Sequence, residues 1–127
     1  MVLLKYNYNA KENYNYIKDL LKMNKLYLPK SIDRKDPLVS PIYAKHLNGI
    51  PSTYLITAEY DPLQDEAEAY AKELAKAGVR VIYQKFPGMI HGFISMATLI
   101  DDSFKACLSI CEAIKIAFSV KPFKKSA

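Results

Sequence analysis

Two short apolar segments, with a helical pattern between them, dominate the arrangement of hydrophobic positions along the chain. Residues 52–58, "STYLITA", are rich in β-branched side chains and lack the polar alternation of a strand with one solvent face. This pattern predicts a strand covered on both faces, as in a parallel sheet. Residues 79–86, "VRVIYQKF", predict a second strand. Its opposite faces carry Val79, Val81 and Tyr83 on one side, and Ile82 and Phe86 on the other.

Helical spacing of apolar side chains marks the segment after each predicted strand. Between the strands, Asp65 and Glu66 suit a helix N-terminus, and Gly78 suits the position just past its C-terminus. The apolar stripe of this helix is Ala67, Tyr70, Ala71, Leu74 and Ala77. Residues 87–93, "PGMIHGF", predict a turn, and a last helix follows. Its cap candidates are Asp101, Asp102 and Ser103, and its apolar face is Phe104, Cys107, Leu108, Cys111, Ile114 and Phe118.

The order strand, helix, strand, turn, helix predicts an α/β fold with parallel strands joined by a right-handed crossover. A chain of 127 residues is one domain or part of one. We expect four segments along it: an N-terminal helical segment at 1–28, with its helix in 9–28 ending before Pro29, a proline-rich loop at 29–51, the α/β unit at 52–118 and a basic tail at 119–127.

Composition narrows the classes of protein that fit. Apolar residues make up 50% and charged residues 24%, the balance of a globular protein. No apolar run approaches the length of about 18 residues that spans a bilayer, and no signal peptide is evident. The two cysteines, Cys107 and Cys111, lie four apart in a helical pattern, so we expect buried thiols and a cytoplasmic location. The net charge of +5 is dispersed except in the tail, so nucleic-acid binding is not expected.

Two polar residues fall where an α/β sheet places its ligands, beyond the carboxyl ends of the strands. Asp61 lies three residues past the first predicted strand, and His91 lies five past the second. A carboxylate there would hold the imidazole tautomer and leave the other ring nitrogen to act as a general base. Both residues also have ordinary explanations. Asp61 could form a turn or a helix cap, and His91 could bond a backbone carbonyl.

The sequence around this pair resembles a known enzyme family. Residues 51–93 are similar to the C-terminal part of α/β-hydrolase esterases and lipases of the hormone-sensitive-lipase-like group, and the resemblance covers residues 26–118, including "DPLVSP" at 36–41. The family pattern Glu-x-Asp-x-Leu-x-Asp-Glu, then Tyr-x-x-x-Leu, Ala-Gly-Val and His-Gly-Phe, is matched by Glu59, Asp61, Leu63, Asp65, Glu66, Tyr70, Leu74, Ala77, Gly78, Val79, His91, Gly92 and Phe93. The resemblance implies a partial α/β-hydrolase fold, with Asp61 as triad acid and His91 as triad base.

The nucleophile motif of that family is absent from this sequence. The triad order in the fold is Ser, then Asp or Glu, then His, and the serine sits in a G-x-S-x-G elbow. The four glycines frame no serine in that pattern, and the His-Gly-Gly oxyanion loop is also missing. Only 60 residues precede Asp61, too few for the earlier strands of the fold. We therefore expect the C-terminal piece of a larger hydrolase, inactive alone.

The remaining candidates for chemistry are weaker. Ser40 and Ser52 lie beside prolines in loops, and Ser95 suits a turn or helix start. His46 has no partner at metal-ligand spacing. We expect neither a metal nor another cofactor.

Two functional hypotheses remain from the sequence. By resemblance, the chain is an ester-hydrolase piece that holds the triad acid and base and acts on an ester only when a separate N-terminal hydrolase half complements it. The alternative is a non-catalytic α/β module that associates with itself or a partner through a strand edge and uncovered helix faces. A homodimer is the simplest form of that association.

Overall fold

The computed structural model describes residues 18, 19, 21–23 and 25–118. Its helices and strands are the 3-10 turn η1 (Pro41–Tyr43), strand β1 (Thr53–Tyr60), helix α2 (Gln64–Lys76), strand β2 (Val81–Ile90), the 3-10 turn η2 (Phe93–Met96) and helix α3 (Asp101–Phe118). Residues 18, 19, 21–23 and 25–27 are also helical, which agrees with the helix predicted in 9–28. The rest of that prediction, and the basic tail, lie outside the described residues.

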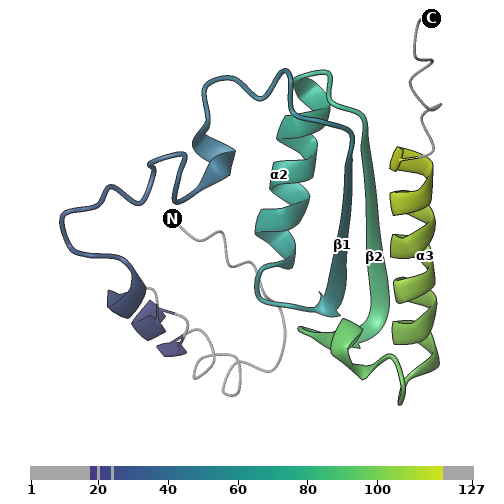
Figure 1. Ribbon diagram of the computed structural model, residues 1–127. Coiled ribbons are helices and arrows are strands. Elements are labelled where there is room, and N and C mark those ends of the chain that lie inside the picture. Colours follow the sequence, from purple (N-terminus) through teal and green to yellow (C-terminus); the bar gives the residue numbers. More distant parts are fainter. Residues whose placement is uncertain (1–17, 20, 24, 119–127) are drawn as a thin grey trace, which may run out of the picture.

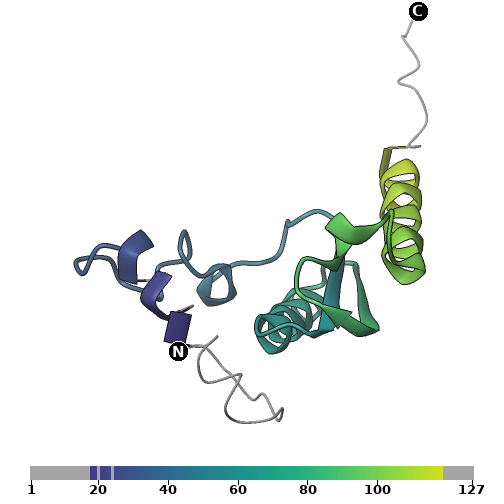
Figure 2. The same ribbon diagram turned by 90° about the horizontal axis from the view of Figure 1, so that it is seen from below.

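The two strands form a parallel sheet with a helix on each side. In register, Thr53 faces Val81 and Ala58 faces Phe86. Helix α2 covers one face and α3 the other, as Figures 1 and 2 show from two directions. The predicted α/β unit of parallel strands is therefore confirmed.

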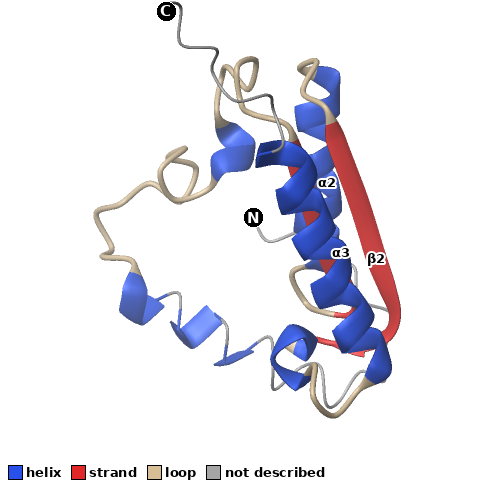
Figure 3. Ribbon diagram, turned by 45° about the vertical axis from the view of Figure 1, so that its right-hand side comes forward, coloured by secondary structure: helices blue, strands red, loops and turns tan. Residues whose placement is uncertain are grey.

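Helix α2 packs as its sequence predicts. Asp65 and Glu66 occupy its first turn, and Gly78 follows its last residues with a φ of 82°. Leu74 is 0% exposed and joins Leu47 and Val79 in one buried cluster. This cluster ties α2 to the segment before β1, which Figure 3 shows as a long tan loop interrupted by η1.

Strand β2 corrects the sequence-based prediction. It ends at Ile90, whereas the sequence predicted an end at residue 86 and a turn from Pro87. The register shifts between Ala58 and Tyr60, so that Tyr60 faces Ile90. Gly88 has a φ of 72°, in the left-handed region that glycine adopts without strain. Pro87 and Gly88 therefore form an irregularity within the strand, and pairing resumes beyond it.

Helix α3 corrects a second prediction. Its buried residues are Ser103 and Ala106, while Phe104 and Leu108 are each 54% exposed and Phe118 is 83% exposed. Cys111 is exposed and Cys107 half-buried, both as free thiols, so the expected buried cysteine face is also wrong. A two-stranded sheet covers only a narrow strip of the helix. The small side chains on that strip let the backbone of α3 approach the sheet closely. The large apolar side chains are left facing outward.

Polar contacts also attach α3 to the sheet. The Tyr54 hydroxyl lies 2.9 Å from Ser109 Oγ and 2.6 Å from Gln84 Oε1, which links the helix to both strands. Ser103 is fully buried, and its hydroxyl has no hydrogen-bond partner among the described residues, so it does not act as the predicted cap. No helix in the described part of the chain is both long and apolar enough to cross a membrane.

Candidate active site

Asp61 and His91 follow directly after the two strands. The sequence placed them three and five residues beyond the strand ends, but β1 continues to Tyr60 and β2 to Ile90. The backbone N–H of His91 donates to the carbonyl oxygen of Tyr60 at 3.2 Å. This bond belongs to the pairing of Tyr60 with Ile90 and brings His91 beside Asp61.

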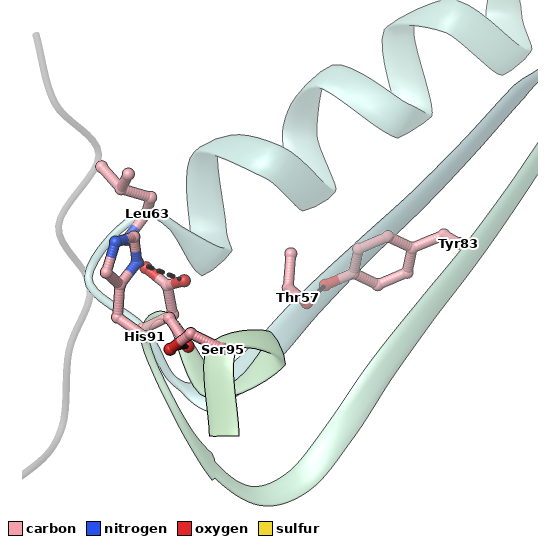
Figure 4. A network of polar contacts seen from close by, with 7 residues as sticks. Thr57, Leu63, Tyr83, His91 and Ser95 are labelled. Carbon is pink, nitrogen blue, oxygen red and sulfur yellow. Dashed lines mark hydrogen bonds and ion pairs between the residues drawn. The ribbon is translucent and has the colours of Figure 1, made fainter. Parts of the chain in front are cut away.

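The two side chains are joined by a hydrogen bond. His91 Nδ1 lies 2.9 Å from Asp61 Oδ2, which confirms the predicted proximity. The other carboxylate oxygen, Oδ1, accepts the backbone N–H of Leu63 at 2.8 Å, so both oxygens are engaged. Figure 4 shows the imidazole directed at the carboxylate at the end of the sheet. The carboxylate is thereby fixed in orientation, and it in turn orients the ring.

This geometry selects one neutral form of the imidazole. An ionised carboxylate can only accept hydrogen bonds, so Nδ1 carries the proton and Nε2 keeps its lone pair. No described residue hydrogen-bonds Nε2. The Asp61 side chain is 14% exposed, whereas that of His91 is 54% exposed. The arrangement can accept a proton at Nε2 and stabilise the resulting imidazolium through Asp61.

The residues after His91 explain why its ring stays exposed. Gly92 adopts a φ of 77°, which turns the chain sharply. Phe93 is 4% exposed and packs against Phe86, with the ring centroids 5.2 Å apart. Ser95 Oγ donates to the Gly92 carbonyl oxygen at 2.8 Å and closes the turn. Phe93 thus anchors the loop in the core, and His91 is left at the rim.

The other candidate residues do not join this site. The Ser95 hydroxyl donates to the Gly92 carbonyl oxygen of its own turn, and Figure 4 shows Ser95 beside His91 without a bond between them. No described serine hydrogen-bonds His91. Ser52 and His46 are exposed, and Ser40 is half-buried in the loop before η1. The described residues contain no cluster of three His, Cys, Asp or Glu side chains suited to a metal ion.

Glu59 is a site-proximal residue that sequence reasoning noted only as part of the family pattern. Its Oε2 accepts the backbone N–H of Gly88 at 2.7 Å, across the irregularity in β2. Glu59 is the last residue but one of β1, and Asp61 follows the strand directly. The Glu-x-Asp spacing at the end of the first strand was the feature of the sequence that could have identified Glu59 as a residue near the site.

The chain is similar to known esterases over this region. Residues 4–95 match the family described as the α/β hydrolase fold, a stretch that includes Asp61 and His91. The chain is 40% identical over 70 residues to an arylesterase of Saccharolobus solfataricus, covering 55% of this chain and 23% of that protein. It is 33% identical over 89 residues to an ethyl acetate hydrolase of Pseudomonas putida, covering 70% and 28%.

Solved structures of esterases also resemble this chain. The carboxylesterase EstE1, cloned from a metagenomic library, superposes with a TM-score of 0.76 at 33% identity, covering 84% of this chain and 35% of that one. The hormone-sensitive-lipase homologue EstE7, also from a metagenome library, superposes with a TM-score of 0.75 at 29% identity, covering 80% and 34%. The chain spans about a quarter of the length of the curated relatives it matches. Its sequence and its parallel strand–helix unit place the chain in the α/β-hydrolase fold family, and the relatives it resembles there are esterases and a hormone-sensitive-lipase homologue.

Proposed function

We propose that Asp61 and His91 are the acid and base of a Ser-His-Asp triad for carboxylic ester hydrolysis. The observation that carries this proposal is the 2.9 Å bond between His91 Nδ1 and Asp61 Oδ2 at the ends of adjacent strands. His91 Nε2 would take the proton of a serine hydroxyl as it attacks the ester carbonyl, and Asp61 would stabilise the imidazolium. His91 would then deliver that proton to the leaving alcohol.

The nucleophile belongs, in this proposal, to polypeptide outside these 127 residues. The sequence contains no G-x-S-x-G elbow, and the hydroxyl of Ser95 is engaged in its own turn. Acid and base alone cannot form an acyl-enzyme. The oxyanion donors, each worth about 100- to 1,000-fold in rate, would come with the nucleophile. The chain by itself is therefore expected to lack specific esterase turnover.

Uncovered surfaces support a complementing partner. Among the described residues β1 pairs only with β2, so the other edge of β1 has no strand beside it. An apolar strip of exposed side chains runs along α3, made of Phe104, Leu108, Ile114 and Phe118. The chain covers only 35% of the EstE1 chain. The proposed occupant of both surfaces is the nucleophile-bearing part of an α/β-hydrolase domain.

A complementation assay tests this function. The 127-residue chain is mixed with a separately produced N-terminal part of a related esterase that carries the serine elbow, and hydrolysis of short-acyl nitrophenyl esters is followed. We expect turnover only in the mixture, and its loss with His91→Ala. His46→Ala is the matched control and should retain turnover. Rapid turnover by the 127-residue chain alone, blocked by a serine-directed phosphonate, would contradict the proposal.

The apolar strip on α3 also favours a second candidate, a non-catalytic module that associates with a copy of itself. Exposed apolar patches of this kind mark association surfaces. A closed homodimer could bury this strip between its two copies, and that association would not need a nucleophile. Sedimentation velocity distinguishes the two. A stable dimer whose mixture with the nucleophile part shows no turnover would support the module, and a monomer would reject it.

A further inference from the structure

The register irregularity in β2 determines which residue stands beside Asp61. Two steps along β1, from Ala58 to Tyr60, correspond to four steps along β2, from Phe86 to Ile90. If the register of Ala58 continued without a shift, Tyr60 would face Gly88, and Asp61 would face Met89. The two extra residues of β2 therefore bring His91 to the rim beside Asp61.

Backbone bonding alone does not hold this irregularity. Pro87 has no N–H to donate to the ladder. The next N–H, that of Gly88, donates to a side chain, Glu59 Oε2, at 2.7 Å. Glu59 is the one residue of β1 that lies opposite the extra residues. A hydrogen bond to an ionised acceptor is short and stronger than a neutral one.

The segment is anchored on both sides of this bond. Before it, Phe86 is buried with Ala58 and Phe93, and just after it Met89 packs against the same cluster. After it, the N–H of His91 donates to the Tyr60 carbonyl oxygen. The Glu59–Gly88 bond spans the interval between these anchors, where Gly88 has its positive φ.

We infer that Glu59 is a positioning residue for His91. By accepting the Gly88 N–H, its carboxylate closes the irregularity and thereby keeps the imidazole within reach of Asp61. In this role Glu59 acts through the backbone of β2, by way of the Gly88 N–H. The catalytic meaning of this role rests on the proposed function, but the geometric role can be measured without any substrate.

The test compares three substitutions at Glu59. Glu59→Gln keeps an acceptor oxygen at the same reach, Glu59→Asp keeps the charge but shortens the reach, and Glu59→Ala removes both. Two readouts are taken for each: hydrogen exchange at the Gly88 and His91 amides, and the tautomer of the His91 ring from its nitrogen chemical shifts. The spectra are recorded at about pH 8.5, where a histidine side chain is neutral. The chain has only two histidines, so His46 serves as an internal reference.

We expect Glu59→Ala and Glu59→Asp to accelerate exchange at Gly88 by about tenfold or more and to mix the His91 tautomers, whereas His46 stays unchanged. Glu59→Gln should keep one tautomer. Val79→Ala is the control for general destabilisation, because Val79 is buried in the separate cluster with Leu74. It should lower the melting temperature and leave the His91 tautomer intact. If Glu59→Ala does not fold, Glu59→Asp carries the same comparison.

Two outcomes would overturn the inference. One is an unchanged His91 tautomer and unchanged Gly88 exchange in Glu59→Asp, or in Glu59→Ala. The other is a mixed His91 tautomer in Val79→Ala, which would show that any destabilisation loosens the ring. A mixed tautomer in the parent chain counts against the proposed function instead, so the two failures are distinguishable.

Discussion

Helices α2 and α3 lie on opposite faces of the same two strands, yet they bury different kinds of residue. Helix α2 buries Ala71 and Leu74 from its apolar stripe, whereas α3 buries Ser103 and Ala106 and exposes its larger apolar side chains. On α2, Leu74 is buried in a cluster with Leu47 and Val79. The partners of the outer face of α3 are not among the described residues. This difference is the reason why we propose the outer face of α3 as the surface that packs against another polypeptide.

The largest effect should come from truncating the core beneath α2. Leu74→Ala removes a side chain that is 0% exposed, and we expect it to lower the free energy of unfolding by about 2–5 kcal/mol. Leu108→Ala on α3 is the matched control, because Leu108 is 54% exposed, and its effect should stay within about 0.5 kcal/mol. Urea unfolding measures both. Equal losses would contradict the contrast between the helices.

The apolar strip on α3 should affect association more than folding. The double substitution Phe104→Glu and Leu108→Glu places charges on side chains that are each 54% exposed. We expect stability to change by about 0.5 kcal/mol or less, while complementation of esterase activity is lost. The charged pair Lys72→Glu and Lys76→Glu on the exposed side of α2 is the control. Full complementation by the α3 variant would place the partner elsewhere.

The polar link between α3 and the sheet should contribute less to stability than the core beneath α2 does. Tyr54→Phe removes the hydroxyl that contacts Ser109 and Gln84, and Tyr83→Phe removes the hydroxyl that lies 2.8 Å from Thr57 Oγ1 on the α2 face. Each should cost about 1 kcal/mol in stability. Only Tyr54→Phe should also speed amide exchange in α3 at a given denaturant concentration. Faster exchange in α3 for both variants would mean that the two faces are not independent.

The smallest effect concerns the first turns of α2. Burial raises the pKa of Glu66, whereas a hydrogen bond from Lys72 lowers the pKa of Glu68. A raised folded-state pKa gives stability that is present below the unfolded pKa and lost as pH rises through the folded value. A lowered folded-state pKa gives stability that is present above the unfolded pKa and lost as pH falls through the folded value. Glu66→Gln should therefore increase the gain in stability as the pH rises from about 4 to 7, and Glu68→Gln should reduce the gain as the pH rises from about 3 to 5. Urea midpoints across that range check the signs, and identical pH profiles for the two variants would contradict them.

Local patterns predicted the parts of this molecule that depend on neighbours in sequence. The parallel strands, α2 with its Gly78 terminus, and the meeting of Asp61 with His91 follow from periodicity and from the geometry of a crossover. The continuation of β2 past Pro87 did not, because proline and glycine usually end a strand, and here Glu59 satisfies the Gly88 N–H. The buried side of α3 was also missed. A helix with apolar residues on several sides is oriented by the surface it packs against, and here that surface is two strands wide.

The state of the His91 ring tests the central claim most directly. Its nitrogen chemical shifts are measured in the parent chain and in Asp61→Asn at about pH 8.5, where a histidine side chain is neutral, with His46 as the reference. The parent should show a protonated Nδ1 and an unprotonated Nε2, because Asp61 Oδ2 accepts from Nδ1 at 2.9 Å. Asp61→Asn should shift the proton toward Nε2, since the amide can donate to Nδ1. A parent ring protonated at Nε2, or a tautomer that is the same in both proteins, would contradict the assignment of Asp61 and His91 as a catalytic pair.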